Sequence, residues 1–357
     1  GRAIILAHRA ELIFQAMNRL KEDVGLHCDV EMADLRADQN SFLKAPVVVS
    51  TIQSQIAGCN GYRRFMRFDP HEFKVVVVDE AHHCAAASYR SVLDHYKQNS
   101  HIRIFGCTAT PDRHDEQALG QIFGSCCFNY GIVDAIRDGW LVPIQQQFVH
   151  VDSLDLSACR TTAGDLNGAD LARVMEVERN LHAVASPVIE LCGDRKAIIF
   201  AASVFQAERL AEILCRHKSG CAEVVSGTTD SEVRADRICR FRNSDFPYLC
   251  NVGIATEGFD IPDVEVVVCA RPTKSRALYA QMIGRGTRPL TGVGIDDVET
   301  AEERIALIAN SAKPSMTVFD FVGNSGRHKL MSAVDVLGGE YSDKVAELAY
   351  REASKNG

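Results

Sequence analysis

The sequence predicts an α/β protein with two parallel sheets, and three observations support this. Short runs of β-branched and aliphatic residues recur and alternate with segments whose apolar residues have helical spacing. The clearest run is residues 75–78, because four consecutive valines fit a strand that is buried on both faces. A chain of 357 residues also exceeds one typical hydrophobic core, so we expect two domains.

Two carboxylates, Asp79 and Glu80, directly follow the valine strand. Open α/β sheets bind ligands at the carboxyl ends of their strands. An aspartate there can hold Mg²⁺ through its water shell, and an adjacent glutamate can deprotonate a water aimed at a γ-phosphate. The alternative is a buried strand that ends in a solvated acidic turn, and motifs further along the chain favour the first interpretation.

Composition narrows the classes of function. The formal net charge of −8 argues against a uniformly basic nucleic-acid coat but is compatible with a local basic groove. No apolar stretch is long enough to cross a bilayer, so we expect no membrane partner. Thirteen cysteines are scattered without a C-x-x-C pair, which argues against a zinc ribbon and indicates reduced thiols in a cytoplasmic protein.

The first part of the chain alternates strands with helices up to about residue 140. Arg9 lies in the loop after the first strand, where it could contact a phosphate, although a lone loop arginine is more often solvated. Residues 62–68 interleave basic and aromatic residues, and we expect a surface helix there rather than a nucleic-acid contact. Besides the valine run, strands are predicted at residues 3–7, 47–49 and 102–107, with a helix at 11–20.

Apolar periodicity breaks down after residue 141, where Pro143 and the glutamines at 145–147 predict a connecting segment. A second α/β unit follows, and its last predicted strand, residues 317–322, is expected to close the sheet. The other strands are predicted at residues 197–200, 222–225, 248–252 and 264–269, with helices at 169–177, 207–214, 234–241 and 345–353. Between residues 271 and 289 every charge is positive, which indicates an anionic ligand.

Four motifs occur in the order and spacing of the superfamily 2 helicases and translocases. The chain resembles this superfamily over residues 3–328, and in particular the branch related to the helicase subunit of type III restriction enzymes. The motifs are Asp79-Glu80-Ala81-His82, Thr108-Ala109-Thr110-Pro111, Glu257-Gly258-Phe259-Asp260-Ile261-Pro262 and Gln281-x-x-Gly284-Arg285-x-x-Arg288.

The resemblance implies two RecA-like domains with ATP and Mg²⁺ between them. The expected boundaries are residues 1–141 for the first domain, 142–180 for a linker, 181–325 for the second domain and 326–357 for a tail. Asp79 would position Mg²⁺ through water, and Glu80 would activate the attacking water. His82, Thr108 and Thr110 would couple hydrolysis to domain motion. Gly258, Asp260 and Gln281 would face the nucleotide, and Arg285 and Arg288 would be arginine fingers.

The same resemblance implies a nucleic-acid path across both domains, with duplex DNA as the expected partner and nuclease or methyltransferase subunits outside this chain. Residues of these types grip phosphates without reading sequence. The residues expected to line the path are Arg9, Thr51, Gln53, Ser203, Thr228 and Thr256.

One family motif is missing from the sequence. No G-x-x-x-x-G-K-[ST] phosphate loop occurs in these residues, although such a loop cradles the β- and γ-phosphates. We expect the loop to lie upstream of Gly1, so that these residues alone bind ATP poorly and are inactive. The predicted function is an ATP-dependent helicase or double-stranded DNA translocase. The alternative is a non-hydrolysing nucleic-acid-binding or assembly module that has lost the phosphate loop.

Overall fold

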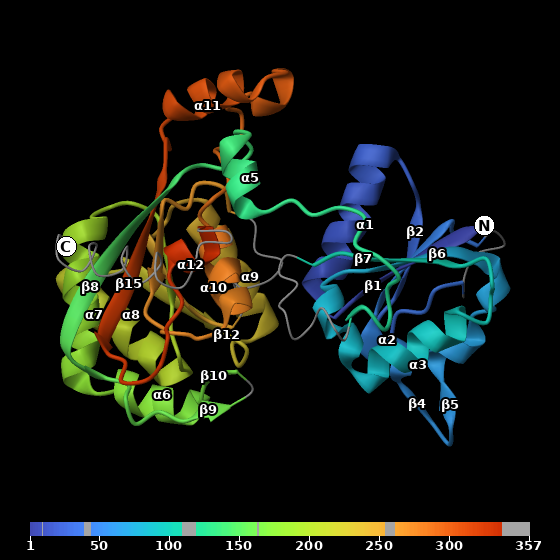
Figure 1. Cartoon of the computed structure of the whole chain (residues 1–357), viewed down its shortest axis with the longest axis horizontal. Coiled ribbons are helices and arrows are strands. Elements are labelled where there is room, and N and C mark those ends of the chain that lie inside the picture. Colours follow the sequence, from blue (N-terminus) through green and yellow to red (C-terminus); the bar gives the residue numbers. More distant parts are fainter. Residues whose placement is uncertain (9, 39–43, 109–118, 163, 254–260, 338–357) are drawn as a thin grey trace. The chain divides into compact units, whose positions relative to one another are not determined.

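The computed structural model describes residues 1–8, 10–38, 44–108, 119–162, 164–253 and 261–337. The chain divides into two compact units, Gly1–Asn129 and Tyr130–Gly357, and each contains one main parallel sheet (Figure 1). The predicted α/β class with two parallel sheets is therefore confirmed. Within the described ranges, no helix has both the length and the apolar character that crossing a membrane requires.

Unit 1 contains a five-stranded parallel sheet in the order β2-β3-β1-β6-β7. The strands are β1 (Arg2–Ala7), β2 (Cys28–Glu31), β3 (Val47–Thr51), β6 (Phe73–Val78) and β7 (Arg103–Gly106). The short strands β4 (Gly58–Cys59) and β5 (Tyr62–Arg63) form a separate hairpin. The valine run pairs on both sides, with β1 and β7. Val76 and Val78 are buried, whereas Val75 and Val77 are half-buried, so the expected burial on both faces is only partly realised.

Helices cover both faces of this sheet because side chains alternate along its strands. Val47 and Val49 pack in one core cluster with Ile13 of α1, whereas Val48 packs in another with Val92 of α3. The helices are α1 (Ala10–Val24), α2 (Ile52–Ile56) and α3 (Ala87–Tyr96), with 3₁₀ turns η1 (Arg64–Arg67), η2 (Pro70–Glu72) and η3 (Ala81–Ala85). Turn η3 begins at the end of β6, so the sheet fixes where the carboxylates lie.

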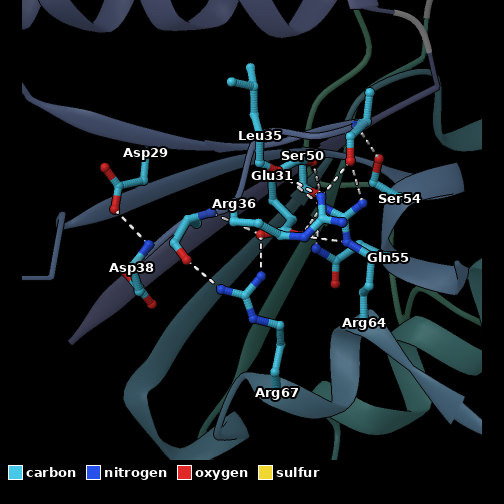
Figure 2. A network of polar contacts seen from close by, with 12 residues as sticks. Asp29, Glu31, Leu35, Arg36, Asp38, Ser50, Ser54, Gln55, Arg64 and Arg67 are labelled. Atoms are coloured by element: carbon cyan, nitrogen blue, oxygen red, sulfur yellow. Dashed lines mark hydrogen bonds and ion pairs between the residues drawn. The ribbon is translucent and has the colours of Figure 1, made fainter. Parts of the chain in front are cut away.

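The basic and aromatic residues 62–68 form β5 and η1 instead of the expected surface helix. Two of their three arginines, Arg64 and Arg67, point at Glu31, whose side chain is fully buried (Figure 2). Arg64 donates through Nε to Glu31 Oε1 at 2.6 Å, and Arg67 donates through Nη1 to Oε2 at 2.8 Å. Arg64 Nη1 also donates to the carbonyl of Ala33 at 2.7 Å. Arg64 and Arg67 therefore have a structural role, because they connect η1 to the end of β2.

Replacing Glu31 with glutamine is expected to lower the free energy of unfolding by about 3 kcal/mol. Loss of the carboxylate leaves two largely buried guanidinium groups without their counter-charge. Urea denaturation measures the change. Asp23→Asn is the matched control because Asp23 forms an exposed pair with Arg19, and it is expected to shift stability by less than about 0.5 kcal/mol. Equal effects of the two variants would contradict the prediction.

Unit 2 contains a six-stranded parallel sheet in the order β12-β13-β11-β14-β15-β8. The strands are β8 (Ile144–Asp155), β11 (Ala197–Phe200), β12 (Ala222–Ser226), β13 (Tyr248–Val252), β14 (Val266–Cys269) and β15 (Met316–Asn324). The short strands β9 (Thr161–Thr162) and β10 (Asp165–Leu166) pair with each other. Because β15 pairs with β8, the segment expected to close the sheet is next to its edge.

Both faces of the second sheet are also covered. Ile199 packs in a core cluster with Val188 of α7 and Leu210 of α8, whereas Ile198 packs in another with Met282 of α10 and Phe241 of α9. The helices are α5 (Ile132–Arg137), α6 (Gly168–Met175), α7 (Glu178–Cys192), α8 (Val204–His217), α9 (Ser231–Arg242), α10 (Arg276–Gly284), α11 (Ala301–Ala309) and α12 (Ala333–Leu337), with the 3₁₀ turn η4 (Ile295–Asp297).

The units differ from the expected domain boundaries. Residues 142–180, expected to be a linker, belong to unit 2, because β8 adds an edge strand to its sheet and Leu171 and Met175 join its core. Gln145 and Gln147 point outward from that edge strand, which gave the segment its polar, linker-like appearance. Part of the expected tail, residues 326–357, packs as well: Val336 of α12 joins the core. The helix expected at 345–353 lies outside the described residues.

Candidate functional site

The turn after β6 holds the two candidate carboxylates in a strained conformation. The amide of Asp79 donates to Leu6 O at 2.9 Å, and the amide of Ala81 donates to Cys107 O at 2.8 Å, so both neighbouring strands anchor the turn. Between them, Glu80 adopts left-handed backbone angles, φ 50° and ψ 54°, and its amide donates to Asp79 Oδ1 at 3.0 Å. This conformation costs a non-glycine residue about 1–2 kcal/mol, and such strain concentrates at functional sites.

His82 brings Glu80 and Thr108 into one contact group. Its Nδ1 lies 3.1 Å from Thr108 Oγ1 and 3.3 Å from Glu80 Oε2. A side chain from the turn after β7 is thus joined through an imidazole to the candidate base. The structure brings together three of the sequence-predicted residues of unit 1, whereas Thr110 lies outside the described residues.

Sequence reasoning missed two members of this cluster, His8 and His83. The ring of His83 lies 4.1 Å from that of His82 and 4.7 Å from that of His8, measured between centroids. His8 directly precedes Arg9, whose own position lies outside the described residues. The doubled histidine after Ala81 was the available signal, although only the fold brings His8 against it.

Thr51 and Gln53, expected to bind nucleic acid, lie at the start of α2. The Thr51 hydroxyl caps this helix by accepting from the Ser54 amide at 3.2 Å, and it donates to Ser54 Oγ at 2.8 Å. Thr51 is buried, so its hydroxyl has a structural role here. Gln53 is exposed, and its Nε2 donates to the carbonyl of His8 at 2.9 Å.

Ser203 and Thr228 are the described members of the predicted nucleic-acid path in unit 2. Ser203 caps α8 by accepting from the Gln206 amide at 3.0 Å, and its hydroxyl donates to Glu176 Oε1 at 2.5 Å. Thr228 is exposed, with its hydroxyl 2.9 Å from Ser226 Oγ. Thr256, Gly258 and Asp260 lie outside the described residues.

The two candidate fingers occupy an irregular turn after α10. Gln281 lies within that helix, Arg285 is its half-buried C-cap and Arg288 is exposed. The backbone between the arginines packs closely on the sheet: a Cβ on Gly286 would lie 2.8 Å from Met316 Sδ. A larger residue would require the end of the Met316 side chain to move. The backbone of this turn therefore packs against β15.

Three other cations in the basic run 271–289 contact residues of unit 2. Arg271 pairs with Asp165 at 3.7 Å, Lys274 Nζ donates to Thr161 Oγ1 at 2.9 Å, and Arg276 donates to a main-chain carbonyl of α12. The run is therefore partly structural rather than wholly an anion site. The candidate carboxylates belong to unit 1 and the candidate arginines to unit 2.

Two family models match the chain. Residues 1–113 match the type III restriction enzyme res subunit, and residues 183–289 match the helicase conserved C-terminal domain. The putative ATP-dependent helicase IRC3 of Saccharomyces cerevisiae is 31% identical over 296 residues, which are 80% of this chain and 41% of that protein. The type I restriction enzyme EcoAI endonuclease subunit of Escherichia coli is 28% identical, over 63% of this chain and 31% of that protein. The chain thus spans less than half the length of these relatives.

Solved structures support the fold. A fragment of a putative HsdR subunit from Vibrio vulnificus has a TM-score of 0.61 and 18% identity, covering 94% of this chain and 54% of that chain. Dbp5 of S. cerevisiae bound to RNA and ADP BeF3 has a TM-score of 0.61 and 18% identity, covering 99% of this chain and 81% of that chain. The two sheets therefore have the RecA-like architecture of tandem helicase domains.

Proposed function

We propose that this chain, which belongs to the superfamily 2 helicases, couples ATP hydrolysis to movement on double-stranded DNA. The observation that supports this best is the Glu80 cluster. A strained glutamate follows Asp79 at the end of a buried strand and lies against His82, which also contacts Thr108. Backbone strain of this kind concentrates at functional sites, which supports the site interpretation over a solvated strand end.

The described residues fit a magnesium-bound triphosphate in part. The Asp79 and Glu80 side chains offer hard carboxylate oxygens at the carboxyl end of a parallel strand, which suit a hydrated Mg²⁺. When bound, ATP supplies the phosphoryl group whose transfer to water releases free energy. The sequence holds no phosphate-loop motif, so the cradle for the β- and γ-phosphates is not among these residues.

Each candidate residue has a distinct role in this proposal. Asp79 would hold Mg²⁺ through its water shell, and Glu80 would accept the proton of the attacking water. His82 links Glu80 to Thr108, because its Nδ1 contacts both side chains. Arg285 and Arg288 stabilise the negative charge that spreads over the transferred phosphoryl group, and Gly258, Asp260 and Gln281 face the nucleotide.

Duplex DNA is the proposed partner because relatives include type I restriction endonuclease subunits, which also suggests that nuclease or methylation subunits act with the whole protein. The test is ATP hydrolysis by the full-length protein with duplex DNA, single-stranded DNA or RNA. We expect duplex DNA to give the largest stimulation, and DNA binding to weaken steeply with salt. Salt-sensitive binding without any hydrolysis would instead identify a non-hydrolysing module.

A further inference from the structure

Lys313 is a buried lysine in the loop between α11 and β15, and only 1% of its surface is exposed. Its Nζ donates to the carbonyl of Pro262 at 2.6 Å and to the carbonyl of Arg288 at 2.7 Å. These carbonyls end the two candidate nucleotide-facing segments of unit 2, residues 257–262 and 281–288. One ammonium group thus joins two segments that are far apart in sequence.

Keeping this ammonium group buried is unfavourable. Burial lowers the pKa of Lys313 to about 8, although Asp263 and Glu265 act in the opposite direction at longer range. A methionine or leucine would fill an apolar site without this desolvation cost. Strongly perturbed lysines of this kind are more frequent at functional sites than elsewhere.

Two hydrogen bonds fix the turn at Thr287, the residue before Arg288. The Thr287 carbonyl accepts from the Val142 amide at 2.8 Å, and the Thr287 hydroxyl donates to Gly284 O at 2.9 Å. Lys313 makes the next hydrogen bond along the turn, to the carbonyl of Arg288 itself. Because Arg288 is exposed, its backbone position determines where its guanidinium can reach.

We infer that Lys313 is a positioning residue that holds the backbone of Arg288 at a fixed place relative to residue 262. This inference rests on the proposed function, in which Arg288 stabilises the transition state. A displacement of about 1 Å in a catalytic group can reduce turnover about 100-fold. Lys313 touches neither substrate nor nucleotide in this scheme.

The first experiment measures DNA-stimulated ATP hydrolysis by the full-length protein carrying Lys313→Met or Lys313→Arg. We expect Lys313→Met to reduce kcat at least about tenfold with little change in KM, since the arginine acts in the transition state rather than in ground-state binding. Lys313→Arg, which can still donate to both carbonyls, is expected to recover part of kcat. An equal loss in both variants, or a rise in KM alone, would overturn the inference.

Lys196→Met is the matched control. Lys196 is also buried, and it lines a cavity together with Lys313. Its Nζ binds the carbonyl of Arg242 and the carboxylate of Asp263, not Arg288. We expect this variant to lower the melting temperature and to leave kcat unchanged. A loss of kcat equal to that of Lys313→Met would assign the effect to general destabilisation and overturn the inference.

Amide hydrogen exchange tests the positioning separately from catalysis. The amide of Val293 lies beyond Arg288, on the side that the Thr287 bonds do not hold, and it donates to Leu290 O. We expect this amide to exchange faster in Lys313→Met and at the wild-type rate in Lys196→Met. Unchanged exchange in Lys313→Met would overturn the inference. If the wild-type protein hydrolyses no ATP, the proposed function fails, and hydrogen exchange still decides whether Lys313 holds the turn.

Discussion

Replacing Glu80 with glutamine is expected to abolish DNA-stimulated ATP hydrolysis, with a loss of about 10²–10⁴-fold in kcat. Glutamine keeps the size of the side chain and its ability to bond His82, but it cannot accept the proton of the attacking water. DNA binding should remain at the wild-type level because no nucleic-acid contact is proposed for Glu80. Steady-state phosphate release and a DNA-binding titration measure the two quantities.

Glu22→Gln is the control for this prediction, since Glu22 lies exposed on α1 and the same charge is lost. The control should hydrolyse ATP at the wild-type rate. Stimulated turnover that survives Glu80→Gln would remove Glu80 from the mechanism. A parallel loss of folding, seen as a lower melting temperature, is not expected, because the left-handed backbone at this position disfavours both side chains alike.

The sequence predicted the buried parallel strands well because burial on both faces leaves a continuous apolar run, as in β11 and β14. It failed at β8, an edge strand on which Gln145 and Gln147 are exposed, because three consecutive glutamines look like a linker. The arginines of η1 were also misread, because Glu31 lies 33 residues before Arg64 and only the sheet brings them together.

In the candidate site too, a local motif reveals some residues, whereas only the fold reveals others. Asp79, Glu80 and His82 are consecutive or nearly so, and one short turn brings them together, so a local motif was enough to find them. Lys313 gave no local signal, because its partners are main-chain carbonyls and a lone lysine in a polar loop reads as solvated. Contacts to carbonyl groups leave no trace in side-chain patterns.

Replacing Arg285 or Arg288 with alanine is expected to reduce kcat by about 10³–10⁵-fold, the largest effect for any residue of unit 2. A guanidinium that meets the transferred phosphoryl group stabilises charge that develops only in the transition state, so nucleotide affinity should change much less than kcat. Lysine should not restore activity, because an ammonium lacks the planar fork that contacts two phosphate oxygens at once. Single-turnover hydrolysis and nucleotide titration separate the two effects.

Arg276→Ala distinguishes an arginine finger from a residue that only adds positive charge to the basic run. Arg276 is exposed at the start of α10 in the same basic run, and its side chain donates to the carbonyl of Val336. If the run acts only by attracting anions, all three alanine variants should weaken DNA or nucleotide binding alike and leave kcat in place. If Arg285 and Arg288 are fingers, only their variants lose kcat, because long-range attraction raises encounter rates and cannot replace a guanidinium in contact with the reacting phosphate. Wild-type kcat in both finger variants would exclude them from the transition state.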